Sequence, residues 1–339
     1  MLRALLVGAG GMGRAWARTI ADAYPKLLLV GWVDIVPGLA SAAVADLAKR
    51  SSEVVLPFTN LEEAITVTQP DFVVDVTVPE AHEEVTVMSL RCGVPVLGEK
   101  PMALTLESAK RMIHASKSAN RLYMVSQSRR YDSGLRTFRD AIDSMGGLGI
   151  LSADFFIGAH FGGFRDVMPD VLLKDMAIHT FDAARFLIGS KPLSVYCDSF
   201  RVPWSWYDGN ESAMATFEFE SGVRFSYRGS WAAEGHQTEW ESNWRAVCKD
   251  GTVAWNGADQ VVIDRVISHV GFIRPTEAVQ VSIDSLEHSG IDGSLHDFVS
   301  ALEHDTEPMG ICSDNIWSLA MVLYAVESSR IGQKVDIAI

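Results

Sequence analysis

Gly8-Ala9-Gly10-Gly11-Met12-Gly13 follows an apolar run, 2–7, and leads into a segment with helical spacing. This is G-x-G-x-x-G between a strand and a helix, the arrangement that binds the pyrophosphate of a dinucleotide. The first glycine permits a tight turn, the second lets the backbone approach the phosphates, and the third lets helix and strand pack closely. The helix N-terminus stabilises the negative charge. A glycine turn without a ligand is the alternative, and the flanking pattern favours binding.

Asp34 ends the second apolar run, 27–33, about 20 residues after the glycines, where dinucleotide-binding folds place an acidic residue. A carboxylate there accepts both ribose hydroxyls of NAD and repels the 2′-phosphate of NADP. The next residues, Ile35 and Val36, supply no arginine for that phosphate. We therefore expect NAD, with NADP as the alternative. The residues predicted to bind it here are Gly8, Gly10, Gly11, Met12, Gly13 and Asp34.

Outward from this motif, short apolar runs alternate with longer amphipathic segments up to about residue 125. The pattern predicts strand-helix-strand units and a doubly wound parallel sheet covered on both faces. The expected strands are 2–7, 27–33, 54–58, 72–76, 94–97 and 122–125, with helices near 12–23, 38–49, 61–67, 81–92 and 105–118.

Beyond residue 150 the pattern changes to alternation of apolar and polar residues, as in 214–220 and 223–231. This alternation predicts antiparallel strands with one packed face, joined by a turn at 220–222. Helices are expected at about 172–187, 291–303 and 314–329. We predict two domains, 1–125 for NAD binding and 126–339 for substrate binding and oligomerisation, with the C-terminal helix free to pack back on the first.

The chain has 339 residues and a formal charge of -14, from 29 Lys plus Arg and 43 Asp plus Glu. This balance argues against nucleic acid or an anionic membrane as the main partner. Four cysteines without a C-x-x-C pair argue against a zinc knuckle or a disulfide scaffold, and no metal is predicted. The N-terminal apolar run is too short for a signal peptide, so we expect a cytoplasmic protein.

Glu99-Lys100-Pro101 follows the fifth predicted strand, at the edge where open parallel sheets bind ligands. A lysine there can hydrogen-bond a substrate hydroxyl and favour the alkoxide that develops as hydride leaves. A surface lysine is the alternative. Thr77, Pro79 and His82 follow the fourth strand at the same edge. We predict that the residues facing the cofactor there are Thr77, Pro79, His82, Glu99 and Lys100, with His82 structural rather than catalytic.

The helix expected at 172–187 carries Asp175, His179 and Asp182, whose spacings of four and three place them on one stripe. Histidine can take a proton near neutral pH, and an acidic residue one turn away can orient it or share the substrate. A solvated helix face with an incidental histidine is the alternative. Seven of the nine tryptophans lie beyond residue 200, where they either form core or line a cleft.

Together these motifs, in this order, resemble the Gfo/Idh/MocA oxidoreductases, and the resemblance extends to a closing helix at 314–335. It implies an N-terminal Rossmann domain, a C-terminal α/β domain with a large open, mainly antiparallel sheet, and nicotinamide-dependent redox chemistry. The resemblance to members similar to inositol dehydrogenase implies three roles. Lys100 polarises the reacting hydroxyl, Asp175 holds a neighbouring hydroxyl and His179 is the general base. Relatives also imply a homodimer or homotetramer formed through the sheet.

The chain departs from the family where many members carry glycines, at 168–174 and at Ala177. The segment 159–165, with His160 and Arg165, is expected to supply that flexibility. We predict a dehydrogenase of a cyclitol, sugar or glycoside. The alternatives are an NAD(P)H-dependent reductase of a ketosugar, imine or enone, and a non-catalytic dinucleotide sensor. Predicted substrate contacts are Lys100, Arg129, Tyr131, His160, Arg165, Asp175 and His179, with Asp182, Trp204 and Trp206 as further polyol-matching groups.

Overall fold

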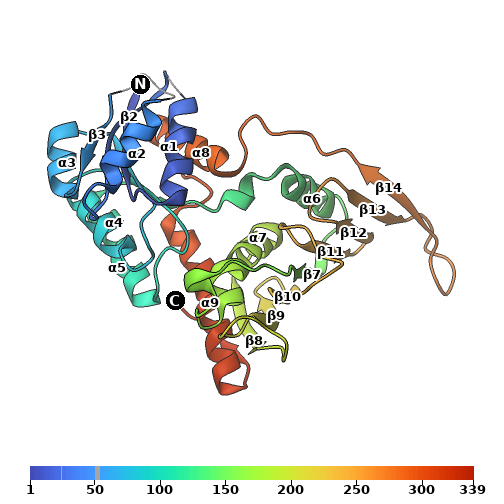
Figure 1. The fold of residues 1–339 in the computed structure, drawn as a ribbon. Helices are drawn as coiled ribbons and strands as arrows, with labels where there is room; N and C mark the ends of the chain where they lie inside the picture. The colour runs from blue at the N-terminus through green and yellow to red at the C-terminus, as the bar shows by residue number, and fades with distance from the viewer. Residues whose placement is uncertain (24, 50–53) are drawn as a thin grey trace. The chain divides into compact units, whose positions relative to one another are not determined.

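The computed structural model describes residues 1–23, 25–49 and 54–339 and is shown in Figure 1. The chain divides into two compact units. The first comprises Met1–Ser128 and Gly290–Ile316, and the second comprises Arg129–Ser289 and Trp317–Ile339. Within the described ranges, the helices are all too short or too polar to cross a membrane.

The first unit contains a six-stranded parallel sheet with the strand order β3-β2-β1-β4-β5-β6. All six predicted strands form, with ends that differ by at most two residues from those expected. The strands are β1 Leu2–Val7, β2 Leu27–Val33, β3 Leu56–Phe58, β4 Phe72–Asp75, β5 Val96–Gly98 and β6 Tyr123–Val125. The helices are α1 Gly11–Asp22, α2 Leu39–Leu47, α3 Leu61–Thr68, α4 His82–Arg91, α5 Leu106–Ala119 and α8 Gly290–His304, and α9 Cys312–Ile331 begins here.

The strand order reverses between β1 and β4, which makes the carboxyl ends of these two strands the switch point at which doubly wound sheets bind ligands. Strands β4, β5 and β6 are buried along their whole length. Their apolar side chains are covered from both sides, for example where Phe298 of α8 packs edge-on against Phe72 of β4. The predicted doubly wound fold is confirmed.

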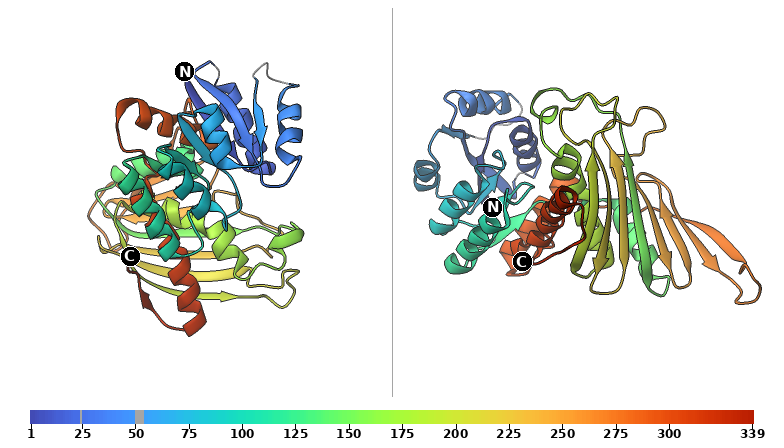
Figure 2. Two further views of the ribbon diagram at one scale, coloured as in Figure 1. Left: turned by 90° about the vertical axis from the view of Figure 1, so that its left-hand side faces the viewer. Right: turned by 90° about the horizontal axis from the view of Figure 1, so that it is seen from below.

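The second unit contains a nine-stranded sheet, in which β7 and β10 run parallel and the other neighbours antiparallel. Its order is β14-β13-β12-β11-β7-β10-β9-β8-β15, and Figure 2 shows the strands side by side. The strands are β7 Leu148–Phe156, β8 Pro192–Phe200, β9 Ser212–Phe219, β10 Arg224–Ser230, β11 Asn243–Cys248, β12 Gly251–Trp255, β13 Val261–Val266, β14 Thr276–Val281 and β15 Val335–Asp336. Its helices include α6 Ser133–Asp143 and α7 Ile178–Ile188.

The predicted alternation is confirmed by the burial of β9 and β10. Phe217 and Phe225 face each other in register and are buried, whereas Met214 and Arg228 form an exposed pair. Phe181 of α7 packs edge-on against both buried phenylalanines, so α7 covers this face. We call the opposite face, with alternate residues such as Met214 and Arg228, the open face.

The helix expected at 172–187 is present but begins with a π-helical segment, Leu172–Ala177, before α7. Asp175 lies in the π-helical segment and His179 in the α-helix, so the assumed uniform helical spacing of the stripe was wrong. Single turns of π-helix inside α-helices are frequent at functional sites. The departure from regular helix therefore coincides with the predicted acid/base pair.

Candidate functional site

The glycine loop lies between β1 and α1, at the switch point of the first sheet. Gly8 has φ +103°, and a Cβ there would lie 2.6 Å from the carbonyl oxygen of Val76. A Cβ on Gly13 would overlap the carbonyl oxygen of Gly8. At Gly10 and Gly11, by contrast, a Cβ would have no heavy atom within 4 Å. The fold itself needs the outer glycines, whereas the middle two leave open space in front of the helix.

The N-terminus of α1 carries no capping side chain and no acidic residue in its first turn. Its first backbone N–H groups are therefore available to an anion, as the pyrophosphate of a dinucleotide requires. The open space at Gly10 and Gly11 adjoins these donors. The loop thus fits NAD by its own geometry.

Asp34 follows β2 and is half-buried. Its Oδ2 accepts a hydrogen bond from the N–H of Ala9 at 2.8 Å, and its Oδ1 accepts one from Val36 at 2.9 Å. The carboxylate is thereby fixed beside the glycine loop. Because a carboxylate offers about four acceptor positions, it retains capacity for ribose hydroxyls.

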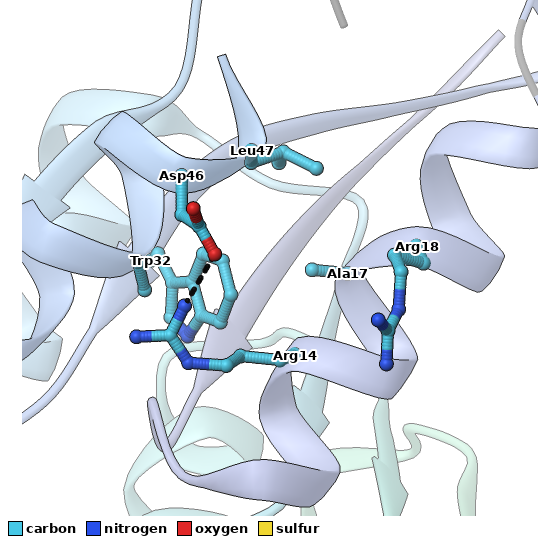
Figure 3. Close-up of a pocket in the computed structure, with 7 residues that line it drawn as sticks. Arg14, Ala17, Arg18, Trp32, Asp46 and Leu47 are labelled. Carbon is cyan, nitrogen blue, oxygen red and sulfur yellow. Dashed lines mark hydrogen bonds and ion pairs between the residues drawn. The ribbon is translucent and has the colours of Figure 1, made fainter. Parts of the chain in front are cut away.

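Two arginines, Arg14 and Arg18, line a groove between α1 and α2 in the first unit (Figure 3). Arg14 forms an ion pair with Asp46 of α2 at 3.1 Å, so its charge is partly compensated. Ile35 and Val36, beyond Asp34, are exposed and uncharged. The residues that line the groove are Arg14, Ala17, Arg18, Trp32, Ala43, Asp46 and Leu47.

Lys100 follows β5, and the backbone around it is held by Glu99. The carboxylate of Glu99 accepts a hydrogen bond from the N–H of Lys100 at 3.0 Å and from the indole N–H of Trp16 at 2.8 Å. The N–H of Glu99 donates to the carbonyl oxygen of Asp75 at 2.9 Å. Glu99 thus links α1, β4 and the Lys100 loop, and its predicted place facing the cofactor stays a prediction.

His82 and Thr77 lie in the same network. The His82 ring is buried, with Nδ1 2.9 Å from the carbonyl oxygen of Pro101 and Nε2 3.1 Å from that of Thr77. Both ring nitrogens therefore face backbone carbonyls, which agrees with the structural role expected for His82, and its place facing the cofactor stays a prediction. Thr77 donates from its hydroxyl to the buried carboxylate of Asp75 at 2.6 Å, and Thr86 donates to the same carboxylate at 3.3 Å.

Asp175 and His179 belong to the second unit, and Lys100 belongs to the first. The Asp175 carboxylate accepts a hydrogen bond from Nε of Arg165 at 2.7 Å. The Arg165 guanidinium also lies over the rings of Phe161 and Phe164, 5.0 and 4.7 Å from their centroids. The predicted substrate residues Arg165 and Asp175 are thus brought together, and the loop before the π-helical segment orients the acid.

His160 lies in an aromatic cluster of the second unit. Its ring stacks on Trp206 with centroids 3.8 Å apart, and its Nε2 lies 3.0 Å from a carboxylate oxygen of Glu234. The carbonyl oxygen of Ala159 accepts hydrogen bonds from Trp206 and Tyr207, and burial raises the pKa of Tyr207 to about 12. Two sets of ring contacts lie in this unit, and together we call them the aromatic cluster: Trp206 with Tyr207, and Phe155, Phe161, Trp231 and Trp240.

Three predicted substrate groups are engaged inside the second unit. Asp182 is 1% exposed and accepts two hydrogen bonds from Arg130, at 2.7 and 2.8 Å, and one from Ser318 at 2.6 Å. Its predicted contact with a polyol was wrong, because the side of α7 that carries Asp182 faces the core. Tyr131 is also buried, with the guanidinium of Arg136 over its ring.

Arg129 is the third of these groups. It pairs with Glu241 at 2.7 Å and donates to the carbonyl oxygen of Trp240 at 2.6 Å. Burial lowers the pKa of Arg129 and raises the pKa of Glu241. The contacts tie Arg129 to the segment that carries Trp240 of the aromatic cluster, so its substrate contact stays a prediction.

Several residues at these sites were missed from the sequence. Asp75 holds Thr77, Glu234 pairs with His160, and Glu241 pairs with Arg129. The last two partners lie 74 and 112 residues from the groups they contact, and no local pattern pairs them. Asp75 ends a fully apolar strand at the switch-point edge, which is the signal that could have identified it. Among the described residues, no group of three or more His, Cys, Asp or Glu is arranged to hold a metal.

Comparison with known proteins matches residues 2–127 to the oxidoreductase family with an NAD-binding Rossmann fold, GFO_IDH_MocA, and residues 165–254 to a GFO/IDH/MocA C-terminal domain. The uncharacterized protein y4oX of Sinorhizobium fredii is 26% identical over 99% of this chain and 95% of its own. The 1,5-anhydro-D-fructose reductase of Ensifer adhaerens is 24% identical over 98% and 97%. Inositol 2-dehydrogenase 2 of Saccharopolyspora erythraea is 31% identical over 64% and 63%.

Among solved structures, an Agrobacterium radiobacter oxidoreductase in complex with NAD+, L-tartaric acid and magnesium superposes with a TM-score of 0.87 at 18% identity, covering 99% of this chain and 98% of the other. A levoglucosan dehydrogenase in complex with NADH gives 0.83 at 18% identity, covering 99% of each chain. These likenesses establish the shared fold. With both family domains matched in order, the chain belongs to the GFO/IDH/MocA family of oxidoreductases, whose N-terminal domain is an NAD-binding Rossmann fold.

Proposed function

We propose that this protein is an NAD-dependent dehydrogenase that oxidises a secondary hydroxyl of a cyclitol, sugar or glycoside. The observation that carries the proposal is the placement of Lys100. It follows β5 at the same carboxyl edge as the glycine loop after β1 and Thr77 after β4. An amine for a substrate hydroxyl thus stands at the edge of the sheet where the dinucleotide binds.

When bound, NAD supplies the hydride acceptor. Lys100 donates a hydrogen bond to the reacting hydroxyl and stabilises the charge that develops on its oxygen. His179 takes the hydroxyl proton, and Asp175, oriented by Arg165, accepts from a neighbouring hydroxyl. Fixing these groups relative to the substrate supplies much of the catalysis.

The accessible tryptophans of the aromatic cluster, Trp206 and Trp240, support a ring-shaped polyol as the substrate. Such a ring has apolar faces and a polar edge, which match indole faces beside ion-paired carboxylates. Trp206 and Trp240 supply aromatic surface, and the pairs His160–Glu234 and Arg165–Asp175 supply polar groups in the same unit. The named relatives act on inositol and 1,5-anhydro-D-fructose, which belong to this chemical class.

Replacing His179 with Ala tests the proposal. We expect kcat to fall by at least about 100-fold, the range for a lost acid/base group, with NADH affinity retained. Turnover is followed at the nicotinamide absorbance with a panel of inositols and glycosides, and affinity by NADH fluorescence. The matched control is His114→Ala. His114 lies on the exposed face of α5, where its ring hydrogen-bonds the hydroxyl of Ser118 on the same helix. Near-normal turnover of His179→Ala would remove His179 from the mechanism.

Reduction is the second candidate, favoured by the similarity over nearly the whole chain to a 1,5-anhydro-D-fructose reductase. The same groups would then run in reverse, with His179 giving a proton to the oxygen of a ketosugar. Rates of NAD-linked oxidation of polyols and NAD(P)H-linked reduction of ketosugars, measured side by side on the wild-type protein, separate the two directions.

We further propose that the open face joins copies of this chain into a homodimer or homotetramer. Apolar side chains on β7, β8 and β9 support this, since Ile150, Tyr196 and Met214 are 50, 51 and 52% exposed. We expect Met214→Glu to lower the molar mass measured by light scattering, because a charge would be buried in the contact. Val67→Asp, a charge on the exposed side of α3, is the control. An unchanged mass for Met214→Glu would argue against this face.

A further inference from the structure

The buried ring of His82 joins two loops of the first unit. His82 is the first residue of α4 and only 2% exposed. Its Nδ1 lies 2.9 Å from the carbonyl oxygen of Pro101, and its Nε2 lies 3.1 Å from that of Thr77. Both acceptors lie outside α4, so the ring serves the two loops and not its own helix.

The two loops follow adjacent parallel strands, β4 and β5, at the carboxyl edge of the sheet. The first carries Thr77, and the second carries Lys100 immediately before Pro101. In the tautomer that carries its proton on Nδ1, the ring donates to the Pro101 carbonyl and restrains the backbone directly after Lys100. Nε2 of the same ring lies against the Thr77 carbonyl, in the neighbouring loop.

The backbone before Lys100 is restrained independently. The N–H of Glu99 donates to the carbonyl oxygen of Asp75, and the N–H of Lys100 donates to the Glu99 carboxylate. Asp75 also accepts from the hydroxyl and the N–H of Thr77, at 2.6 and 3.1 Å. The contacts form a closed circuit from Asp75 through Thr77, His82, Pro101, Lys100 and Glu99 back to Asp75.

We propose that His82 is a positioning residue that sets the place of Lys100 through its bond to the Pro101 carbonyl. The inference rests on the proposed function in one respect: there, Lys100 donates a hydrogen bond to the reacting hydroxyl of the substrate. Misplacing a catalytic group by about 1 Å can cost about 100-fold in rate. His82 therefore governs turnover without touching the substrate, and its loss affects kcat more than NADH binding.

Two side chains can replace one half of the ring at a time. In His82→Asn, the amide nitrogen stands near the place of Nδ1 and keeps a donor to Pro101. In His82→Gln, it stands near the place of Nε2 and faces Thr77 instead. His82→Leu removes both ring nitrogens with similar volume. Ser89→Ala is the control, because Ser89 is buried on α4 and its hydroxyl bonds to its own helix at Val85.

We expect kcat to fall about 10- to 100-fold in His82→Leu and His82→Gln, and to stay within about 3-fold of wild type in His82→Asn and Ser89→Ala. The Kd for NADH, from fluorescence, should change by less than about 3-fold in His82→Asn and His82→Gln. Equal kcat in the Asn and Gln variants would overturn the inference, and so would a parallel loss of kcat and NADH binding in His82→Gln. Should His82→Leu fail to fold, the Asn and Gln pair still decides the matter.

A second measurement needs no substrate. Amide hydrogen exchange reports local opening, so exchange at the Lys100 amide should rise at least about 10-fold in His82→Gln and stay near the wild-type rate in His82→Asn. Equal exchange in the two variants would contradict the inference. A wild-type protein that turns over no polyol or ketosugar would contradict the proposed function instead, while the exchange result would still test His82.

Discussion

The two sheets of this chain bury their strands in different ways. In the first sheet β4, β5 and β6 are buried along their whole length, because the sheet is covered on both faces. In the second sheet β9 and β11 alternate between buried and exposed residues, because one face is open. Polar side chains in the first sheet therefore gather where strands end, whereas in the second they also occur along the strands.

This difference decides what a polar residue does. At the carboxyl edge of the first sheet, Thr77 donates to the Asp75 carboxylate, Glu99 donates to the Asp75 carbonyl oxygen and Lys100 donates to the Glu99 carboxylate. These bonds hold a ligand-binding edge in place. In the second unit, Asp182 enters the core as the partner of an arginine, and Asp154 pairs with another arginine on the open face. The comparison yields three predictions on stability and binding.

The largest expected effect is on the covered side of the second sheet. Asp182→Asn removes the charge that pairs with the buried Arg130, and breaking a buried pair from one side costs about 3–5 kcal/mol. Urea denaturation measures this loss. Asp154→Asn, which removes the partner of the more exposed Arg228, should cost about 1 kcal/mol or less. Similar losses of stability in the two variants would mean that burial does not determine how much each ion pair contributes.

A smaller effect is expected in the glycine loop. Gly13→Ala brings a Cβ against the carbonyl oxygen of Gly8 and should cost about 1–3 kcal/mol of stability, as overpacking does. Gly10→Ala meets no protein atom, so stability should change by about 0.5 kcal/mol or less. Its methyl group instead enters the space assigned to the pyrophosphate, and NADH affinity should fall at least about 10-fold. Unchanged NADH affinity in Gly10→Ala would place the pyrophosphate elsewhere.

The smallest effect concerns Glu83, at the surface of the first unit. Hydrogen bonds from Arg111 and then Ser108 lower the pKa of Glu83 from 4.5 to about 2. Because the folded-state pKa is the lower one, the stabilisation is present above pH 4.5 and is lost as the pH falls toward 2. Glu83 is 33% exposed, so solvent screening limits it to about 1 kcal/mol.

Glu83→Gln should therefore flatten the acid side of the stability profile, measured by urea denaturation between pH 2 and 5. Glu80→Gln, an exposed neighbour just before α4, is the control. A profile for Glu83→Gln that matches the wild type would show that the Arg111 contact contributes nothing measurable in solution.

Much of the candidate site could be predicted where chemistry is local. The glycine loop and Asp34 lie at the ends of consecutive strands, so sequence spacing alone brings them together. The helix with Asp175 and His179 was predicted as well, but its π-helical start was not, because apolar spacing does not distinguish one backbone register from another over a single turn. Arg165 and Asp175, only 10 residues apart, were both predicted to contact the substrate, but the ion pair between them was not predicted.

By itself, the sequence determined both sheet types, the ligand-binding edge of the first sheet and the glycines that this edge requires. These follow from periodicity and from backbone sterics, which act over a few residues. Tertiary structure alone decided that Asp182 is a core ion pair, that His160 meets Glu234 and that His82 spans two loops. The reason is that a polar side chain is stabilised by whichever partner the fold brings within about 3 Å, and that partner can come from any part of the chain.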